Sequence, residues 1–201
     1  MYAKQFDFIK IVNQANKGVS YTRNLGLCLA KGDYIWYIDS DDYLPSNNLA
    51  FYLINIAKKS NLCIVRGIYE YYQQKTSKFE KVNAHNKINN IKDQVMTGSE
   101  YLDFCVKNHY VESLTCLSIC KRTFLIQSQI KFIEDILWED MLYWLELLNL
   151  AKGEKIMQTN VIMYVYRLRE NSITHTKNND LIFIFSIIKS FETGKRNLLE
   201  D

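Results

Sequence analysis

The sequence predicts an α/β fold built on a mainly parallel sheet, and three observations lead to that fold class. Helix and strand patterns alternate along the first 65 residues, as they do where helices cover a parallel sheet. Residues 34–38 form a continuous aromatic and β-branched run, which is typical of a strand buried on both faces. The chain has 201 residues, 48% of them hydrophobic, which is enough for one well-buried core. We therefore expect a single domain spanning residues 1–201.

The first predicted elements are a short strand, a loop and a helix. The strand covers Ile9–Val12, and a polar loop follows it as far as Gly18. Ser20 can cap a helix that runs through Ala30, because a serine side chain satisfies free amides at a helix start. Lys31-Gly32-Asp33 then breaks the helical pattern.

The predicted strand over residues 34–38 leads straight into the acidic segment Asp39-Ser40-Asp41-Asp42. A helical pattern then covers residues 47–59, and the next strand candidate covers residues 62–65. Residues 69–92 are polar and rich in tyrosine without a clear period, so they fit either a hairpin or a loop.

The second half of the chain predicts further helices and one more strand. Thr97 and Glu100 have the spacing of a capping box, in which each residue satisfies a backbone amide of the other. The elements predicted after it are a helix over 101–107, a helix from 138 or 139 to 150, a strand over 161–166 and an amphipathic helix over 180–191.

Composition excludes several classes of protein. The 25 basic and 22 acidic residues are interspersed and give a formal charge of only +3, so we expect no nucleic-acid partner. The five cysteines are an odd number without a regular spacing, which indicates free thiols in a reducing compartment. The first residues do not resemble a secretory signal, so we expect a cytoplasmic protein.

The acidic segment is the strongest candidate for a site. Three carboxylates within four residues repel one another, and a divalent cation removes that repulsion. Hard oxygen ligands favour Mg²⁺ or Mn²⁺, which protein carboxylates usually bind together with substrate phosphates. The carboxyl end of a strand in an open α/β sheet is also where ligands bind. The alternative is a solvated turn, since aspartate and serine are common turn residues.

Several spaced motifs around this segment resemble those of the family 2 glycosyltransferases of bacterial surface-polysaccharide synthesis. In the first half these are the loop 16–20, the Arg23-Asn24-Leu25-Gly26 helix start, the Lys31-Gly32 turn and the strand ending in Asp39-Ser40-Asp41-Asp42. In the second half they are the segment 132–140, which ends in Glu139-Asp140 at a helix start, and the segment 164–174, a tyrosine-rich strand followed by a loop with Ser172-Ile173. The resemblance extends from about residue 9 to residue 176.

The resemblance implies a GT-A fold, a Rossmann-like mixed sheet flanked by helices, and an inverting glycosyltransferase activity. The donor would be a nucleotide-diphosphate sugar, UDP-linked in the first instance, and the acceptor a glycan or a lipid-linked glycan. Asp39 and Asp41 would be the DxD pair that holds Mg²⁺ or Mn²⁺, with His175 as a candidate further ligand. Asp140 would be the general base, with Glu139 beside it.

The resemblance also implies residues that bind the donor diphosphate: Arg23, Asp39, Asp42 and Arg169. Arg23 has a structural alternative, a salt bridge to Asp33 or Asp39 without any ligand contact. Asp42 has the alternative of a helix cap or turn residue, and Glu139-Asp140 the alternative of complementing the positive end of their helix. Tyr164 is expected to pack within its strand.

Full-length relatives open with further strands that contact the nucleotide base, and we expect most of that half-site to be absent here, either because the chain is N-terminally truncated or because it is a genuine short form. We expect residues 1–66 to form a partial nucleotide-sugar-binding half, residues 67–176 an acceptor and catalytic half, and residues 177–201 a C-terminal helix. Loss of strands would expose a sheet edge and favour self-association. An inactive or partner-completed binding module is the alternative function, and surface-polysaccharide assembly suggests peripheral contact with the inner face of the membrane.

Overall fold

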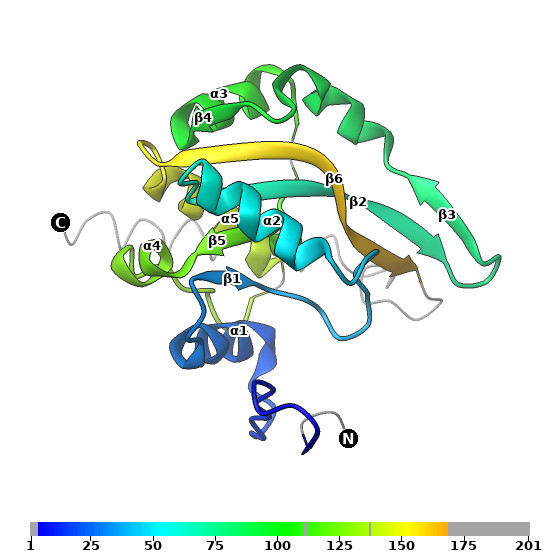
Figure 1. The fold of residues 1–201 in the computed structure, drawn as a ribbon, viewed down its shortest axis with the longest axis vertical. Helices are drawn as coiled ribbons and strands as arrows, with labels where there is room; N and C mark the ends of the chain where they lie inside the picture. The colour runs from blue at the N-terminus through cyan, green and yellow to red at the C-terminus, as the bar shows by residue number, and fades with distance from the viewer. Residues whose placement is uncertain (1–3, 111, 137, 169–201) are drawn as a thin grey trace.

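A computed structural model describes residues 4–110, 112–136 and 138–168 (Figure 1). The strands are β1 (Tyr34–Trp36), β2 (Ile64–Gln73), β3 (Lys78–Lys81), β4 (Val95–Thr97), β5 (Ser118–Lys121) and β6 (Lys155–Leu168). The helices are α1 (Gly18–Leu29), α2 (Leu49–Lys59), α3 (Gly98–Lys107), α4 (Arg122–Gln127) and α5 (Glu139–Leu150). Two 3₁₀ segments, η2 (Asn83–Ile91) and η3 (Thr115–Leu117), complete the described elements.

The strands form one mixed sheet in the order β1-β5-β2-β6-β4, with β3 paired to β2 outside this path. β2 and β6 run parallel, whereas the other pairings of the described strands are antiparallel. The sequence-based expectation of a mainly parallel sheet is therefore wrong, and that of a mixed sheet flanked by helices is confirmed. The difference arises because β5, a four-residue strand too short to detect by pattern, inserts between β1 and β2 and reverses the local direction.

The sheet separates two hydrophobic cores, because successive strand residues point to opposite faces. Ile64 packs on one face with α3 and α5, whereas its neighbour Val65 packs on the other face with α2. In Figure 1, α2 accordingly crosses in front of the sheet while α5 lies behind it. The first of these faces carries the larger core and, as described below, the helix α5 that begins with the candidate site residues Glu139 and Asp140.

The N-terminal part of the chain differs from expectation. Ile9–Val12 was expected to be a strand, but these residues form an exposed irregular segment, with Ile11 53% and Val12 54% exposed. A strand needs a neighbour to accept its backbone hydrogen bonds, and in the described residues none pairs with this segment. Ser20 is not the cap of α1, because the helix begins at Gly18 behind Lys17 and the Ser20 side chain is buried inside it.

β1 is shorter than predicted and lies at the edge of the sheet. It pairs only with β5 among the described strands, and Ile35 is its one buried residue. The expectation of a strand buried on both faces is therefore wrong for residues 34–38. Trp36 instead ties the edge to the interior, because its indole Nε1 donates a hydrogen bond to the carbonyl oxygen of Cys116 at 2.6 Å.

The second half of the sequence-based description is largely confirmed. Thr97 and Glu100 form the capping box in front of α3, and α5 begins and ends where expected. The tyrosine-rich segment forms the β2–β3 hairpin followed by η2, and β6 begins six residues before the predicted strand. The predicted helix over 180–191 lies outside the described residues. Among the described residues, no helix combines the length and apolar character needed to cross a membrane.

Gly67 provides a test of packing in the centre of the sheet. A Cβ atom there would lie 2.6 Å from the backbone oxygen of Val161 and would overlap the side chain of Met163. Because backbone cannot move aside cheaply, we expect Gly67→Ala to destabilise the fold by about 1 to 3 kcal/mol in urea denaturation. Gly26→Ala is the matched control, since its Cβ meets nothing within 4 Å inside α1 and should stabilise the helix by up to about 1 kcal/mol. Equal stability of the two variants would contradict this packing.

Candidate active site

The acidic segment is held against the far end of β6. The backbone amide of Asp39 donates to the hydroxyl of Tyr164 at 3.0 Å, and Tyr43 forms a backbone bridge with Val165. Arg167 makes two further contacts: its amide donates to Asp42 Oδ1 at 2.8 Å, and its Nε donates to the carbonyl oxygen of Asp41 at 2.7 Å. The segment is thus a turn whose shape is fixed by a strand more than 120 residues later.

Arg23 joins the two acidic parts of the sequence. Its Nη2 lies 2.9 Å from Asp39 Oδ1, and its Nη1 lies 2.6 Å from Glu139 Oε1. The side chains of Arg23 and Glu139 are 12% and 13% exposed, whereas that of Asp39 is 40% exposed. Burial lowers the pKa of Arg23, but the neighbouring carboxylates outweigh it and the pKa is raised. One guanidinium therefore holds both carboxylates at a fixed separation.

Asn24 holds the segment that leads to Glu139 and Asp140. Its side-chain amide donates to the carbonyl oxygen of Phe132 at 2.9 Å and accepts from the amide of Phe132 at 2.8 Å. The Phe132 ring stacks on Tyr143 of α5, with ring centroids 3.8 Å apart, and Arg23 lies 5.2 Å from its centroid. Two consecutive residues of α1 therefore position the start of α5. Asn24 fixes the segment that leads into the helix, and Arg23 fixes Glu139, its first residue.

Asp140 lies in the first turn of α5, where the free backbone amides form the positive end of the helix dipole. Burial raises the pKa of Asp140 to about 6, and Glu139 adds to the rise while Arg23 opposes it. A carboxyl with this pKa is ionised at neutral pH and still a useful proton acceptor. Trp138, immediately before the helix, adopts the left-handed conformation with φ 62°, a strained backbone state of the kind that clusters at functional sites.

The remaining aspartates differ in environment. Burial raises the pKa of Asp42, and the hydrogen bond from the amide of Arg167 works in the opposite direction. Asp42 is not the cap of α2, since that position is taken by Asn48. Asp33 pairs with Lys58 at 2.9 Å, so it is not the partner of Arg23, whereas Asp39 is.

The carboxylate oxygens of the acidic turn are of the kind that binds a hard divalent cation together with a substrate. Asp39 and Asp41 offer carboxylate oxygens two residues apart on one turn, and Asp39 is substantially exposed. Within the described parts of the chain, no three histidine, cysteine or acidic side chains gather closely enough to hold a metal by themselves. Mg²⁺ usually binds through one or two carboxylates and completes its shell with water and phosphate, so this pair fits it.

The structure therefore brings together most of the predicted site residues. Arg23, Asp39 and Glu139 are in direct contact, and Asp140 adjoins them. Asp41 and Asp42 lie on the same turn, held by Arg167. Arg169 and His175 lie outside the described residues.

Three supporting residues were not predicted to act at the site. Tyr164 was expected to pack in its strand, and it does so at 0% exposure, but its hydroxyl also accepts the Asp39 amide. Asn24 stands beside Arg23 in the motif, and that adjacency was the available signal for its role. Phe132 begins the motif that ends in Glu139-Asp140, but its contacts with Asn24, Tyr37 and Tyr143 could not be read from that motif.

Comparison with known proteins agrees with this geometry. The model of the family described as "Glycosyl transferase family 2" matches residues 1–113, which is more than half of the chain and includes the acidic turn. The chain belongs to glycosyl transferase family 2.

Relatives with names match over most of this family 2 chain. A cholesterol galactosyltransferase of Borreliella burgdorferi is 28% identical over 183 residues, covering 86% of this chain and 48% of the relative. A protein of Escherichia coli named UDP-Glc:alpha-D-GlcNAc-diphosphoundecaprenol beta-1,3-glucosyltransferase WfaP is 24% identical over 187 residues, covering 93% and 66%. The chain thus spans about half the length of the first of these curated relatives and about two thirds of the second.

Among solved structures, TarS 1-349 of S. aureus in complex with UDP-GlcNAc superposes with a TM-score of 0.56 at 17% identity. The match covers 80% of this chain and 42% of TarS 1-349. At this identity the likeness concerns the fold, and the mixed sheet with its flanking helices is of the GT-A type.

The environment of Asp140 makes a stability prediction for this family 2 chain. Its pKa is about 6 in the folded protein and about 4 in the unfolded chain, so the folded state binds more protons between these values. The ionised side chain consequently costs stability that is absent below pH 4 and complete above pH 6. We expect Asp140→Asn to raise the unfolding free energy at pH 7.5 by about 1 to 3 kcal/mol, and to have little effect at pH 4.

Chemical denaturation at the two pH values measures this difference. Asp103→Asn is the control, because Asp103 is an exposed carboxylate on α3. A lower stability of Asp140→Asn at pH 7.5 would contradict the assigned environment.

Proposed function

We propose that this chain carries the diphosphate-binding and catalytic part of an inverting glycosyltransferase. The donor is a nucleotide-diphosphate sugar, UDP-linked, and the acceptor is a hydroxyl of a glycan or a lipid-linked glycan. The observation that carries the proposal is the Arg23 bridge, which holds the acidic turn and the first turn of α5 in one site. This brings oxygen ligands suited to a metal-bound diphosphate next to a carboxylate with a pKa of about 6.

On the donor side, Asp41 and Asp39 would hold Mg²⁺ or Mn²⁺ together with the donor phosphates. When bound, the metal would supply Lewis-acid stabilisation of the negative charge that develops on the departing diphosphate. Arg23 keeps Asp39 in place, and Asp42 shapes the turn through its bond to the Arg167 amide. Arg169 and His175 are proposed as further phosphate and metal contacts from the end of the matching motif.

On the acceptor side, Asp140 would act as the general base. As the acceptor oxygen forms its bond to the anomeric carbon, the bond from that carbon to the diphosphate oxygen breaks. The proton of the acceptor hydroxyl passes to Asp140, and the electron pair of the broken bond leaves with the diphosphate. A single displacement of this kind inverts the anomeric configuration. Glu139, fixed by Arg23, would orient Asp140 and accept a hydrogen bond from the acceptor.

The names of relatives support the substrate classes in this proposal. WfaP is named for a UDP-linked donor and a diphosphoundecaprenol acceptor, and the TarS structure is titled as a complex with UDP-GlcNAc. A second candidate is a binding module completed by a partner through the free edge of β1, or by a second copy of the chain. It is favoured by the position of β1 at the edge of the sheet, where its other side pairs with none of the described strands, because an unpaired strand edge can pair with another chain.

The general-base role predicts a pH profile for transfer. Because Asp140 must be ionised, kcat/KM should fall about tenfold per pH unit below pH 6. Asp140→Asn should reduce kcat by about 10²- to 10⁴-fold. Product analysis with a nucleotide sugar measures both effects. Glu146→Gln, which alters another carboxyl of α5 whose pKa is raised, is the control, and it should keep the fall in kcat/KM below pH 6. A wild-type profile in Asp140→Asn would exclude Asp140 as the base.

The metal-diphosphate role predicts linked binding of nucleotide and cation. UDP with Mn²⁺ should raise the melting temperature of the chain, whereas UDP with excess EDTA should raise it much less. Asp41→Asn should remove the metal-dependent part of the shift, and Asp103→Asn should retain it. Absence of any shift with UDP and Mn²⁺ would argue against donor binding. A full shift without transfer would instead favour the binding module.

A further inference from the structure

The most deeply buried charge in the described chain is that of Arg66, at the centre of the sheet. Arg66 lies on β2 opposite Ser118 of β5 and Gln158 of β6, and its side chain is 0% exposed. A buried charge is costly unless several groups compensate it. The hydrogen bonds found for Arg66 in the described residues go to carbonyl and hydroxyl oxygens and not to a carboxylate.

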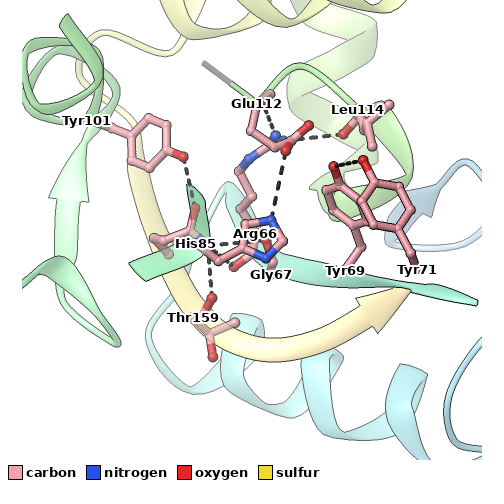
Figure 2. Close-up of polar contacts among 10 residues, drawn as sticks. Arg66, Gly67, Tyr69, Tyr71, His85, Tyr101, Glu112, Leu114 and Thr159 are labelled. Carbon is pink, nitrogen blue, oxygen red and sulfur yellow. Dashed lines mark hydrogen bonds and ion pairs between the residues drawn. The ribbon is translucent and has the colours of Figure 1, made fainter. Parts of the chain in front are cut away.

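The contacts of Arg66 reach three separate segments. Nη1 donates to Ser118 Oγ at 2.9 Å and to the carbonyl oxygen of Leu114 at 3.4 Å, and Nη2 donates to the carbonyl oxygen of Glu112. Figure 2 shows the guanidinium between β2 and the loop that carries Glu112 and Leu114. The guanidinium carbon also lies 4.0 Å from the ring centroid of Trp144, a close cation–π contact with α5.

Two of these segments continue into the candidate active site. Leu114 and Ser118 flank η3, whose residue Cys116 accepts the hydrogen bond of Trp36, three residues before Asp39. Trp144 lies one turn of α5 beyond Asp140. Arg66 therefore contacts the support of the acidic turn and the helix of the proposed base, although it touches neither carboxylate.

The electrostatic surroundings of η3 agree with this arrangement. Burial raises the pKa of the Cys116 thiol well above its ordinary value, and Asp39 adds to the rise. Arg66 acts in the opposite direction, and Asp140 again raises the pKa. The same buried thiol thus lies within electrostatic range of Arg66 and of both site carboxylates, Asp39 and Asp140.

The loop itself is held from a second direction. The Glu112 carboxylate faces His85 of η2 at 3.8 Å, and the imidazole packs edge-on against Tyr69 of β2, with centroids 4.9 Å apart (Figure 2). The side chain of Glu112 thus faces His85, while the backbone carbonyl oxygen of the same residue accepts the hydrogen bond from Arg66. Arg66 consequently bonds to backbone that is already fixed, which makes it a rigid spacer and not merely a space-filling side chain.

We propose that Arg66 is a positioning residue for glycosyl transfer: it fixes the distance between the acidic turn at Asp39 and the first turn of α5 at Asp140. This inference rests on the proposed function, in which the two turns bind the donor and the acceptor respectively. A displacement of about 1 Å between such groups can cost on the order of 10²-fold in rate. Because Arg66 lies behind both turns and contacts no substrate, its loss should lower kcat and leave the KM for the donor near its original value.

Two variants and one control test the proposal. Arg66→Met keeps an apolar stem against Trp144 but removes every hydrogen bond, and Arg66→Lys keeps the charge and part of the bonding. We expect kcat to fall on the order of 10²-fold in Arg66→Met and less in Arg66→Lys. Leu53→Ala removes a fully buried side chain from the opposite core and serves as the control for lost stability. Leu53→Ala should keep the wild-type kcat even where it lowers the melting temperature as much as Arg66→Met does.

Amide hydrogen exchange supplies a readout that does not depend on activity. In Arg66→Met, exchange should quicken both at residues 112–118 and in the first turn of α5, whereas Leu53→Ala should quicken it in α2. If wild-type protein transfers no sugar, the proposed function fails, and the exchange data alone decide the positioning role. A kcat like that of Leu53→Ala, or unchanged exchange at either segment, would overturn the inference. If Arg66→Met does not fold, the same measurements on Arg66→Lys decide.

Discussion

The contact on which the site depends is the one between Arg23 and the two carboxylates Asp39 and Glu139. These residues lie 16 and 116 positions from the arginine, so the salt bridge closes two loops of very different length. A pair of carboxylates brought together in a partly buried place would repel each other, and the guanidinium both offsets that repulsion and sets the geometry. Asn24, the next residue, forms hydrogen bonds with the backbone of Phe132 and so positions the segment that leads into α5.

The sheet provides the frame for this contact. β2 and β6 form its parallel centre, and the residues of β2 alternate between the core under α2 and the core under α5. Arg66 is the polar exception on the α5 face, and its neighbours there are aromatic rings and backbone oxygens. The end of β6 reaches past the sheet to fix the acidic turn through Tyr164 and Arg167. Polar contacts thus connect the sheet to the site at two places, Arg66 and the end of β6.

Sequence reasoning recovered the elements whose signals are local. The capping box at Thr97, the beginning of α5 and the acidic turn all depend on residues within a few positions of one another. Elements defined by distant partners were missed or misjudged: β5 is too short to show a pattern, and Ile9–Val12 has strand composition without a pairing strand in the described residues. The same division holds at the site. The types of Asp39 and Asp140 suggested chemistry, but the bonds from Tyr164 and Asn24 follow from tertiary geometry that no local pattern encodes.

The length of chain between the acidic turn and the end of β6 has a consequence for how the protein is made. Asp39 and Asp42 leave the ribosome before their partners Tyr164 and Arg167, which emerge more than 120 residues later. At a synthesis rate of about 5 to 20 residues per second, the turn waits for several seconds or longer without the strand that shapes it. Parallel pairing of distant strands such as β2 and β6 is also slow because a long loop must close first. The acidic turn should therefore reach its final shape only at the end of folding, when the last described strand docks.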